Sequence, residues 1–378
     1  MKIGCITTSI VPSKTANSIQ AVKVCHALRQ CGQEVRLWVP DFQRAEWDEI
    51  ASIYGISEKF DIEWIPFNKR LKQYDFSYKA VREAIDWDTD VIYTWALQAA
   101  FFGNVRKKPI AMEFHDFPMG FMGPKLFRML MQLPTEKLVM TTTRALAKGI
   151  EDRYQISIDQ DDLQIAPNGT DPDRYQGLPT PAISRRKLGL PSGFTVGYTG
   201  HFYPGRGMNL LIAIAKALPK INFLWVGGME KHIAPWKEQL AADAIENVTI
   251  TGFIPNSQLP QYQAAADILV MPYAQKIEGS SGGNIAPVIN PMKMFDYLSA
   301  GRPIIASNIP VFHEVLNSKL AVFCDPYDAQ EWAEAIKKLS KDRFLRQTMR
   351  EAALDAAEQY SWKNRAQRSI AILDSKVK

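Results

Sequence analysis

Short apolar runs alternate along the chain with longer segments in which apolar residues recur at helical spacing. Residues 2–7 form the first run, and residues 19–30 carry Val22, Leu28 and their neighbours at helical spacing before Gly32. Residues 34–39 form the next run. This order predicts a strand, a loop, a helix and a second strand, which is how a doubly wound parallel sheet begins.

The same alternation continues and then starts again in the second half. Further strands are predicted in the first half at 61–66, 90–95, 109–114, 137–141 and 163–166. The second half repeats the opening unit and is predicted to hold strands at 194–199, 222–226, 247–251, 268–271, 304–306 and 321–323, with helices at 207–218, 328–339 and 342–359. The sequence therefore predicts an α/β protein with two Rossmann-like, doubly wound parallel-sheet domains.

Turn-forming residues at 167–172 and a proline-rich stretch with few apolar residues at 177–191 separate the two halves. Such stretches are typical of domain boundaries. We expect an N-terminal domain of residues 1–176, a linker of residues 177–191 and a C-terminal domain of residues 192–355. The last segment, 356–378, is expected to be a helix that packs back on the N-terminal domain.

Composition narrows the class of protein. Of 378 residues, 45 are basic and 40 acidic, and the net charge of +5 suits an anionic ligand or a membrane surface but is no sign of nucleic-acid binding. The four cysteines have no metal-binding spacing and are predicted to be free thiols in a reducing compartment. No secretory signal and no apolar run of about 18 residues occurs. We expect a cytoplasmic protein, with peripheral contact at the inner face of a membrane left open.

The segment 280–307 carries the most specific chemistry. A run of small residues, Ser280 to Asn284, is followed by Pro291, a short helix, Gly301 and a buried strand. Pro291 suits the first helical position, and Gly301 suits the residue after the helix end. Small residues and a helix N-terminus together favour an anion, and Lys293 adds a full charge. With Asp296 as a ligand for a sugar hydroxyl, the segment predicts a nucleotide-sugar site.

A second loop, residues 200–207, lies between a predicted strand and a predicted helix. Its Gly200-x-x-x-x-Gly205 spacing resembles half of a P-loop, but Arg206-Gly207 stands where Lys-Ser/Thr is required, which disfavours ATP hydrolysis. Arg206 can pair with two phosphate oxygens. The alternative is an exposed arginine in a tight turn. The Gly-x-Gly-x-x-Gly pattern is absent, which disfavours a nicotinamide dehydrogenase.

His115 follows the predicted strand 109–114, at the edge where open α/β sheets bind ligands. It could orient or deprotonate an acceptor hydroxyl, or bind a sugar hydroxyl. The alternative is a structural histidine. His201 shares the loop of Arg206 and is a further candidate on the donor side.

Two other patterns carry less information. The three Asp-x-Asp pairs, which begin at Asp86, Asp159 and Asp171, all fall in predicted turns and favour solvated acids over a metal site. Basic residues Lys69, Arg70 and Lys72 interleave with apolar side chains and could contact a membrane surface or an anionic acceptor, but a solvated helix face fits them better.

These residues identify a family resemblance. The chain resembles the GT-B glycosyltransferases of family 4, which are retaining, metal-independent enzymes that use nucleotide-sugars. The similarity covers nearly the whole length and is strongest from Val196 to Leu316. It rests on the order of several short motifs, namely Gly-Tyr-Thr-Gly with Arg206-Gly207, Trp-Val-Gly-Gly at 225–228, Thr-Gly-Phe-Ile-Pro at 251–255 and the segment 291–307, with Glu-Phe-His-Asp at 113–116 in the first half.

The resemblance implies roles for individual residues. Arg206 and Lys293 would hold the donor diphosphate, with Gly200 and His201 in the same loop, and Asp296 would bind the ribose. Around the donor, Phe253 and Ile254 would contact the base, and Gly283, Asn284, Ile285 and Ala286 would surround the sugar and its phosphates. His115 would lie near the reacting centre, and the acceptor side would include Thr15, Ala16 and Asn17. No metal and no cofactor besides the UDP-, GDP- or ADP-sugar is implied.

The sequence departs from the family pattern at several of these positions. The first acid of the Glu-x7-Glu motif falls at Val288, and the second is Asp296 rather than Glu. His201 stands where an arginine is usual, and Thr15-Ala16 replaces a Gly-Gly loop. These differences leave the activity plausible but give no information on the sugar.

The leading hypothesis is a retaining hexosyltransferase whose two domains face each other across a cleft. The donor binds to the C-terminal domain, and the acceptor, a polysaccharide, glycolipid or small molecule, binds to the N-terminal domain. Two alternatives stay open. One is a sugar-nucleotide epimerase or a phosphorylase of the same fold, and the other is a non-catalytic subunit.

Overall fold

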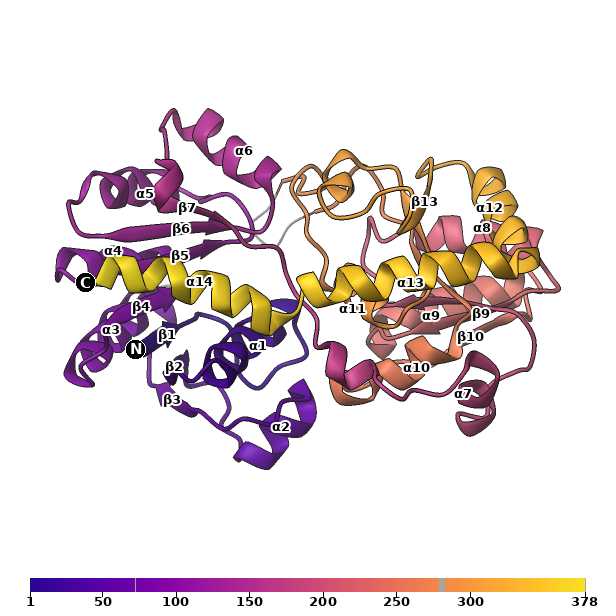
Figure 1. The fold of residues 1–378 in the computed structure, drawn as a ribbon, viewed down its shortest axis with the longest axis horizontal. Coiled ribbons are helices and arrows are strands. Elements are labelled where there is room, and N and C mark those ends of the chain that lie inside the picture. The colour runs from indigo at the N-terminus through magenta and orange to yellow at the C-terminus, as the bar shows by residue number, and fades with distance from the viewer. Residues whose placement is uncertain (72, 279–282, 378) are drawn as a thin grey trace. The chain divides into compact units, whose positions relative to one another are not determined.

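The computed structural model describes residues 1–71, 73–278 and 283–377, and divides the chain into two compact units (Figure 1). Unit 1 contains residues 1–168 and 362–378, and unit 2 contains residues 169–361. The expected linker, residues 177–191, lies within unit 2 and includes a helix, α7 (Pro181–Lys187). Pro181 is the first residue of α7, a position that favours proline. The prolines that predicted a connector are therefore compatible with a helix.

Unit 1 has a seven-stranded sheet among its described residues, in the order β3-β2-β1-β4-β5-β6-β7, and every printed strand pair is parallel. Its strands are β1 (Lys2–Ile6), β2 (Glu34–Pro40), β3 (Asp61–Ile65), β4 (Val91–Thr94), β5 (Ile110–Phe114), β6 (Lys137–Thr141) and β7 (Leu163–Ile165). Its helices are α1 (Ala16–Gln30), α2 (Trp47–Tyr54), α3 (Tyr74–Asp86), α4 (Leu97–Val105), α5 (Gly123–Gln132), α6 (Arg144–Tyr154) and α14 (Trp362–Val377).

Unit 2 has a six-stranded parallel sheet in the order β10-β9-β8-β11-β12-β13 within the described part of the chain. Its strands are β8 (Thr195–Thr199), β9 (Asn222–Val226), β10 (Val248–Ile250), β11 (Ile268–Met271), β12 (Ile304–Ser307) and β13 (Ala321–Cys324). Its other helices are α8 (Met208–Ala217), α9 (Glu230–Ala242), α10 (Leu259–Ala265), α11 (Met292–Ser299), α12 (Ala329–Lys341) and α13 (Arg343–Gln359). The predicted strands are therefore all present, and the prediction of two parallel-sheet α/β domains is confirmed.

The central strands are buried on both faces, because helices cover both sides of each sheet. All residues of β5, β6, β8, β11 and β12 are buried, as parallel sheets require. Local signals fix the ends of the helices. Thr15 caps α1 by accepting a hydrogen bond from the Ser18 N–H, and Gly32 follows it with a left-handed φ of 80°.

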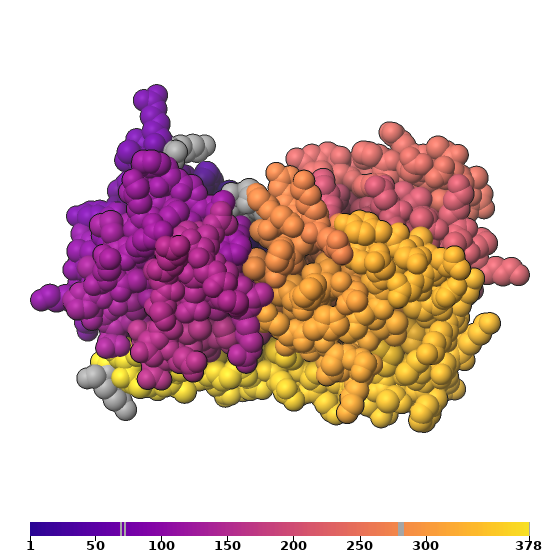
Figure 2. Space-filling view, turned by 90° about the horizontal axis from the view of Figure 1, so that it is seen from above, coloured from indigo at the N-terminus to yellow at the C-terminus, as the bar shows by residue number. Residues whose placement is uncertain are grey.

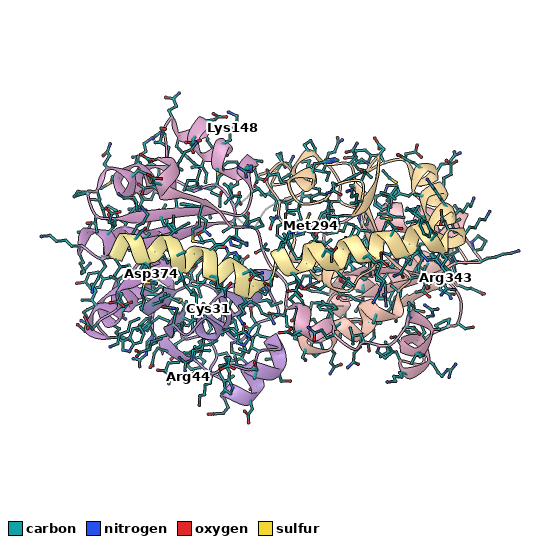
Figure 3. All side chains as sticks on the ribbon, in the orientation of Figure 1. Cys31, Arg44, Lys148, Met294, Arg343 and Asp374 are labelled. Atoms are coloured by element: carbon teal, nitrogen blue, oxygen red, sulfur yellow. The ribbon has the colours of Figure 1, made fainter. Side chains whose placement is uncertain are left out.

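The last helix, α14, belongs to unit 1 although it follows unit 2 in the sequence. It packs against α1, and Figure 1 shows its yellow ribbon across the sheet of this unit. In Figure 2 the yellow atoms of the last residues lie against the purple atoms of unit 1. Cys31, labelled in Figure 3, has its sulfur 3.7 Å from the backbone oxygen of Lys363 on α14. Unit 1 is thus completed by the last residues of the chain.

Helix α11 begins one residue later than predicted. Pro291 has an extended backbone, with ψ 130°, and precedes the first helical residue, Met292. The helix ends as expected, because Gly301 has a φ of 57° directly after Ala300.

The switch points of the two sheets locate the places where ligands bind in this architecture. Chain order reverses between β1 and β4 in unit 1, and between β8 and β11 in unit 2. Loops that leave the carboxyl ends of neighbouring strands diverge there, and the opening between them is the usual ligand site. The loops after β8 and β11 hold Gly200 to Gly207 and Pro272 to Ile277, respectively.

Substitution of Gly207 tests how closely the loops after β8 and β11 must approach each other. An added Cβ atom would lie 1.7 Å from the Pro272 oxygen, and the residue has a φ of 75°. We expect Gly207→Ala to lower the free energy of unfolding by about 3 kcal/mol or more, since strain and a steric clash add. Gly189→Ala is the control, because Gly189 has a φ of 65° with nothing within 4 Å of an added Cβ atom. It should cost about 1 kcal/mol. Urea unfolding measures the two losses of free energy. Equal losses in Gly207→Ala and Gly189→Ala would contradict the expected clash.

Candidate functional site

The donor-side candidates of unit 2 gather at the carboxyl ends of its strands. Gly200 follows β8, and a Cβ atom added there would lie 2.7 Å from the Nζ atom of Lys293. Gly227 follows β9 and abuts the backbone oxygen of Gly200, 2.4 Å from an added Cβ atom. These glycines let the loops after β8 and β9 and the start of α11 approach one another closely.

Lys293 projects from the first turn of α11 between two tyrosines. Its Nζ atom is 3.8 Å from the ring centre of Tyr198 and 5.4 Å from that of Tyr273. The ammonium group is buried, although part of the side chain is exposed, and it has no hydrogen-bond partner among the described residues. The aromatic rings attract the cation but accept no strong hydrogen bond from it, so the group is suited to an anionic ligand.

Arg206 brings a second positive charge to the same place. Its guanidinium carbon is 4.9 Å from the ring centre of Tyr273. Burial lowers the pKa of Lys293 well below its ordinary value, and the charge of Arg206 lowers it further. Two like charges next to each other raise the free energy of this site, and a bound diphosphate would lower it.

Asp296 lies one turn after Lys293 on α11. Its Oδ1 atom accepts a hydrogen bond of 3.2 Å from the Thr170 hydroxyl. Burial raises the pKa of Tyr175 well above its ordinary value, and the charge of Asp296 adds to the rise. The predicted ribose ligand is thus already held by residues at the start of unit 2.

The side chain of Asn284 holds the loop of residues 283–286 in place. Asn284 Oδ1 accepts hydrogen bonds from the N–H groups of Ile277 and Ala286, at 2.9 and 3.1 Å. The Ile285 N–H donates to the Ile277 oxygen. The Ile285 and Ala286 N–H groups therefore already have partners, and Gly283 has a left-handed φ of 82°. Of the small-residue run that predicted this loop, Ser280 to Gly282 lie outside the described residues, as does Lys72 of the basic patch.

His201, Phe253 and Ile254 flank the same edge of the sheet. The His201 ring stacks on Tyr203 with centres 4.8 Å apart. Phe253 and Ile254 directly follow Gly252, which is bridged to Gly227. The structure brings the loops of all donor-side candidates to one edge of unit 2.

The acceptor-side candidates lie in unit 1. Thr15, Ala16 and Asn17 are exposed at the N-terminus of α1. His115 follows β5, is 28% exposed and contacts Glu113 through its Nε2 atom at 2.8 Å. Two further polar groups at this edge are buried without a hydrogen-bond partner in the described ranges, namely the indole N–H of Trp95 after β4 and Oδ2 of Asp116 after β5.

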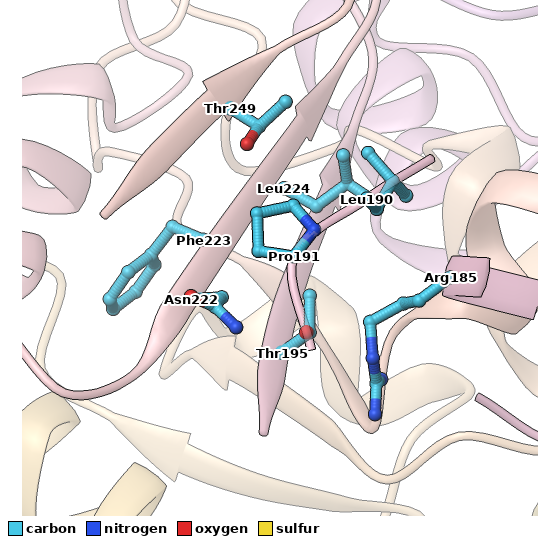
Figure 4. A pocket seen from close by; sticks show the side chains of 8 residues that line it. All are labelled: Arg185, Leu190, Pro191, Thr195, Asn222, Phe223, Leu224 and Thr249. Atoms are coloured by element: carbon cyan, nitrogen blue, oxygen red, sulfur yellow. The ribbon is translucent and has the colours of Figure 1, made fainter. Parts of the chain in front are cut away.

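A pocket at the opposite edge of unit 2 has a structural role (Figure 4). It is lined by residues at the amino ends of β8 and β9, Thr195 and Asn222 among them. Its Arg185 pairs with Asp267 at 2.9 Å, and Asp267 also accepts from the Thr195 N–H. Arg185, the charged residue in the lining of this pocket, is therefore already paired within the fold.

Sequence reasoning missed several residues of both sites. Tyr198 and Tyr273, which enclose Lys293, are indistinguishable in the sequence from other core aromatic residues. Their positions at the ends of buried strands were the available signal. Arg365, which binds Glu113, lies 252 residues away from it in the chain, and no local pattern marks it.

The chain is similar in sequence and in fold to known glycosyltransferases. Residues 193–342 match the family model described as glycosyl transferases group 1. Phosphatidyl-myo-inositol mannosyltransferase of Mycobacterium leprae is 24% identical over 388 residues, which cover 96% of this chain and 93% of that protein. The structure is similar to that of Anabaena HepE in complex with UDP, with a TM-score of 0.75 and 19% identity over 99% of this chain and 100% of that one. A glycosyltransferase from Rickettsia africae gives a TM-score of 0.79 at 14% identity, over 100% of this chain and 98% of that one.

The two parallel-sheet units have the fold of the GT-B glycosyltransferases. Residues 193–342 match the glycosyl transferases group 1, the whole chain is similar to glycosyltransferases of the GT-B fold, and these matches identify it as a glycosyltransferase. No helix in the described part of the chain has the length and apolar character needed to cross a membrane.

Burial of Lys293 makes anion binding depend on pH. A diphosphate would bind to the protonated form, and its negative charge would raise the lowered pKa of Lys293 again. Binding therefore takes up a proton at pH values between the lowered pKa and the ordinary value of 10.5. Affinity should fall as pH rises through this window, by at most about tenfold per pH unit.

Calorimetry with UDP, GDP and ADP between about pH 7.5 and pH 9.5 measures this dependence. Lys293→Met should bind the preferred nucleotide more weakly and with less dependence on pH. Lys319→Met is the control, because Lys319 is an exposed residue of unit 2 away from the site, and it should behave like the wild type. The same pH dependence in Lys293→Met would contradict this role.

Proposed function

We propose that this glycosyltransferase moves a hexose-type sugar from a nucleoside diphosphate to a hydroxyl group of a polysaccharide, a glycolipid or a small molecule. The reaction retains the anomeric configuration and needs no metal ion and no further cofactor. The observation that carries the proposal is the buried ammonium group of Lys293 beside Arg206, at the switch point of unit 2.

The two cations act on the leaving group. As the bond between the sugar carbon and the diphosphate oxygen breaks, negative charge grows on the diphosphate. Lys293, Arg206 and the N–H groups at the start of α11 stabilise that charge, which lowers the barrier without a metal. The new bond to the acceptor oxygen forms on the same face of the sugar. The acceptor proton moves to the leaving phosphate, so no carboxylate nucleophile is required.

The acceptor binds to unit 1 in this proposal. His115, the Trp95 indole N–H and the free Asp116 oxygen offer both a donor and acceptors of hydrogen bonds, which suits a compound with several hydroxyl groups. The mannosyltransferase of M. leprae is named for a lipid-linked inositol, and HepE binds UDP-glucose. The first name supports an acceptor with hydroxyl groups, and the second supports a nucleotide-sugar donor. Contact with the inner face of a membrane is a further part of the proposal.

Loss of Lys293 should slow the chemical step. We expect Lys293→Ala to lower kcat by about 10²–10³-fold, because the charge acts most strongly on the transition state. Lys319→Ala is again the matched control and should leave kcat unchanged. Initial rates with saturating donor measure the effect. A Lys293→Ala enzyme with wild-type kcat would overturn the assignment.

A screen over UDP-, GDP- and ADP-sugars identifies the donor. Release of the nucleoside diphosphate is measured with and without acceptor, once with a chelator and once with Mg²⁺. The proposal expects one base to be preferred and the same rate in both solutions. Turnover that appears only with Mg²⁺ would contradict metal independence.

Stereochemistry tests the retaining mechanism directly. The product made from an α-linked donor should carry an α-linkage, because the acceptor attacks the face that the diphosphate leaves. The coupling constant of the anomeric proton in the NMR spectrum of the product reports this linkage. A β-linked product would require an inverting mechanism and a catalytic base.

A further inference from the structure

The carboxylate of Glu113, at the end of β5, is fully buried and surrounded by donors. Its Oε1 atom accepts hydrogen bonds from the side chains of Gln20, at 2.7 Å, and Arg365, at 2.5 Å. The Tyr93 hydroxyl donates to Oε2. His115 Nε2 completes the set at 2.8 Å from Oε1. Four side chains from four segments of unit 1 therefore meet at one carboxylate.

Arg365 of α14 supplies the positive charge of this cluster. Burial alone would raise the pKa of Glu113, but the charge of Arg365 and hydrogen bonds to His115 and Arg365 hold it below its ordinary value. The guanidinium group also donates to the Tyr93 hydroxyl at 3.3 Å and to the backbone oxygens of Ala166 and Pro167, at 3.3 and 2.9 Å. Its position is therefore fixed from three sides.

The charge of Glu113 decides how His115 presents its ring. A carboxylate can only accept a hydrogen bond, so the Nε2 atom that faces it must carry the proton. In the neutral ring Nδ1 is then unprotonated and accepts a hydrogen bond. With 28% of its side chain exposed, His115 can offer this nitrogen to a hydroxyl group.

We propose that Arg365 is a positioning residue for the transfer reaction, which acts through Glu113 to hold His115 in one orientation and one tautomer. The inference rests on the proposed function, which gives His115 its place near the reacting centre. It assigns to the last helix of the chain a part in catalysis besides its part in folding unit 1.

The alternative is that Arg365 only attaches α14 to unit 1. The same helix offers a control for that role, because Lys376 pairs with Glu136 at 3.5 Å and also with Asp162. Lys376→Met removes a polar attachment of α14 without touching the cluster at Glu113. It should lower stability and leave kcat unchanged.

Kinetics of the full-length protein separate the two roles. Glu113→Gln and Arg365→Met should each lower kcat by roughly 10²-fold, with the donor KM unchanged within about threefold. Arg365→Lys should recover part of the loss, because it restores the charge. In a His115→Ala background neither substitution should lower kcat further, since both act through the histidine. Losses that multiply with His115→Ala, or an equal loss in Lys376→Met, would overturn the proposal.

NMR of the ring nitrogens gives a readout that does not depend on activity. With ¹⁵N-labelled histidine, wild type and Arg365→Lys should show His115 protonated at Nε2. Glu113→Gln should shift it toward the Nδ1-protonated form, because an amide can donate to Nε2. The same tautomer in Glu113→Gln as in the wild type would overturn the proposal.

If His115→Ala transfers sugar at the wild-type rate, the role of His115 in the proposed function fails. The NMR result still decides whether the tautomer of His115 is set by this cluster.

Discussion

The buried ammonium group of Lys293 is the constraint on which the donor side of this protein depends. A buried charge is costly unless it is paired, and here the nearest ionised group that acts on it is another cation, Arg206. Tyr198 and Tyr273 offset part of the cost through their rings. An anion bound beside Lys293 and Arg206 would lower the remaining cost, and this is the physical basis for the diphosphate site that we propose in unit 2.

The buried charge of unit 1, on Glu113, differs from that of Lys293 because it has partners within the fold. The carboxylate of Glu113 is fully buried, and a guanidinium group and three other donors satisfy it within the fold. A saturated carboxylate of this kind is rigid, and it has no capacity left for a ligand. What it can do is orient its neighbour, and the one neighbour with an exposed surface is His115. In our proposal the two units contribute differently to the reaction. Unit 2 provides a cation that has no hydrogen-bond partner among the described residues, and unit 1 provides an oriented histidine ring.

Much of the architecture was predictable because parallel sheets are encoded locally. Strands buried on both faces appear as continuous apolar runs, and the helices between them carry their own caps and stops, such as Thr15, Gly32 and Gly301. Strand ends pointed to His115 and Arg206 as candidates, since ligands bind at carboxyl ends, and a helix start after small residues pointed to Lys293. The expected linker at 177–191 differs from the structure, where α7 lies within unit 2, because proline content marks a helix start as readily as a connector.

The sequence by itself determined the fold class, the family resemblance and the positions of the two cations, because each depends on residues close together in the chain. Only the tertiary structure showed that Asn284 uses the N–H groups of its own loop, that Thr170 holds Asp296, and that Arg365 reaches Glu113. The partners in these contacts are determined by which residues the fold buries together, and not by their spacing along the chain. A buried polar atom must find a partner wherever the fold provides one, and no periodic pattern records which residue that is.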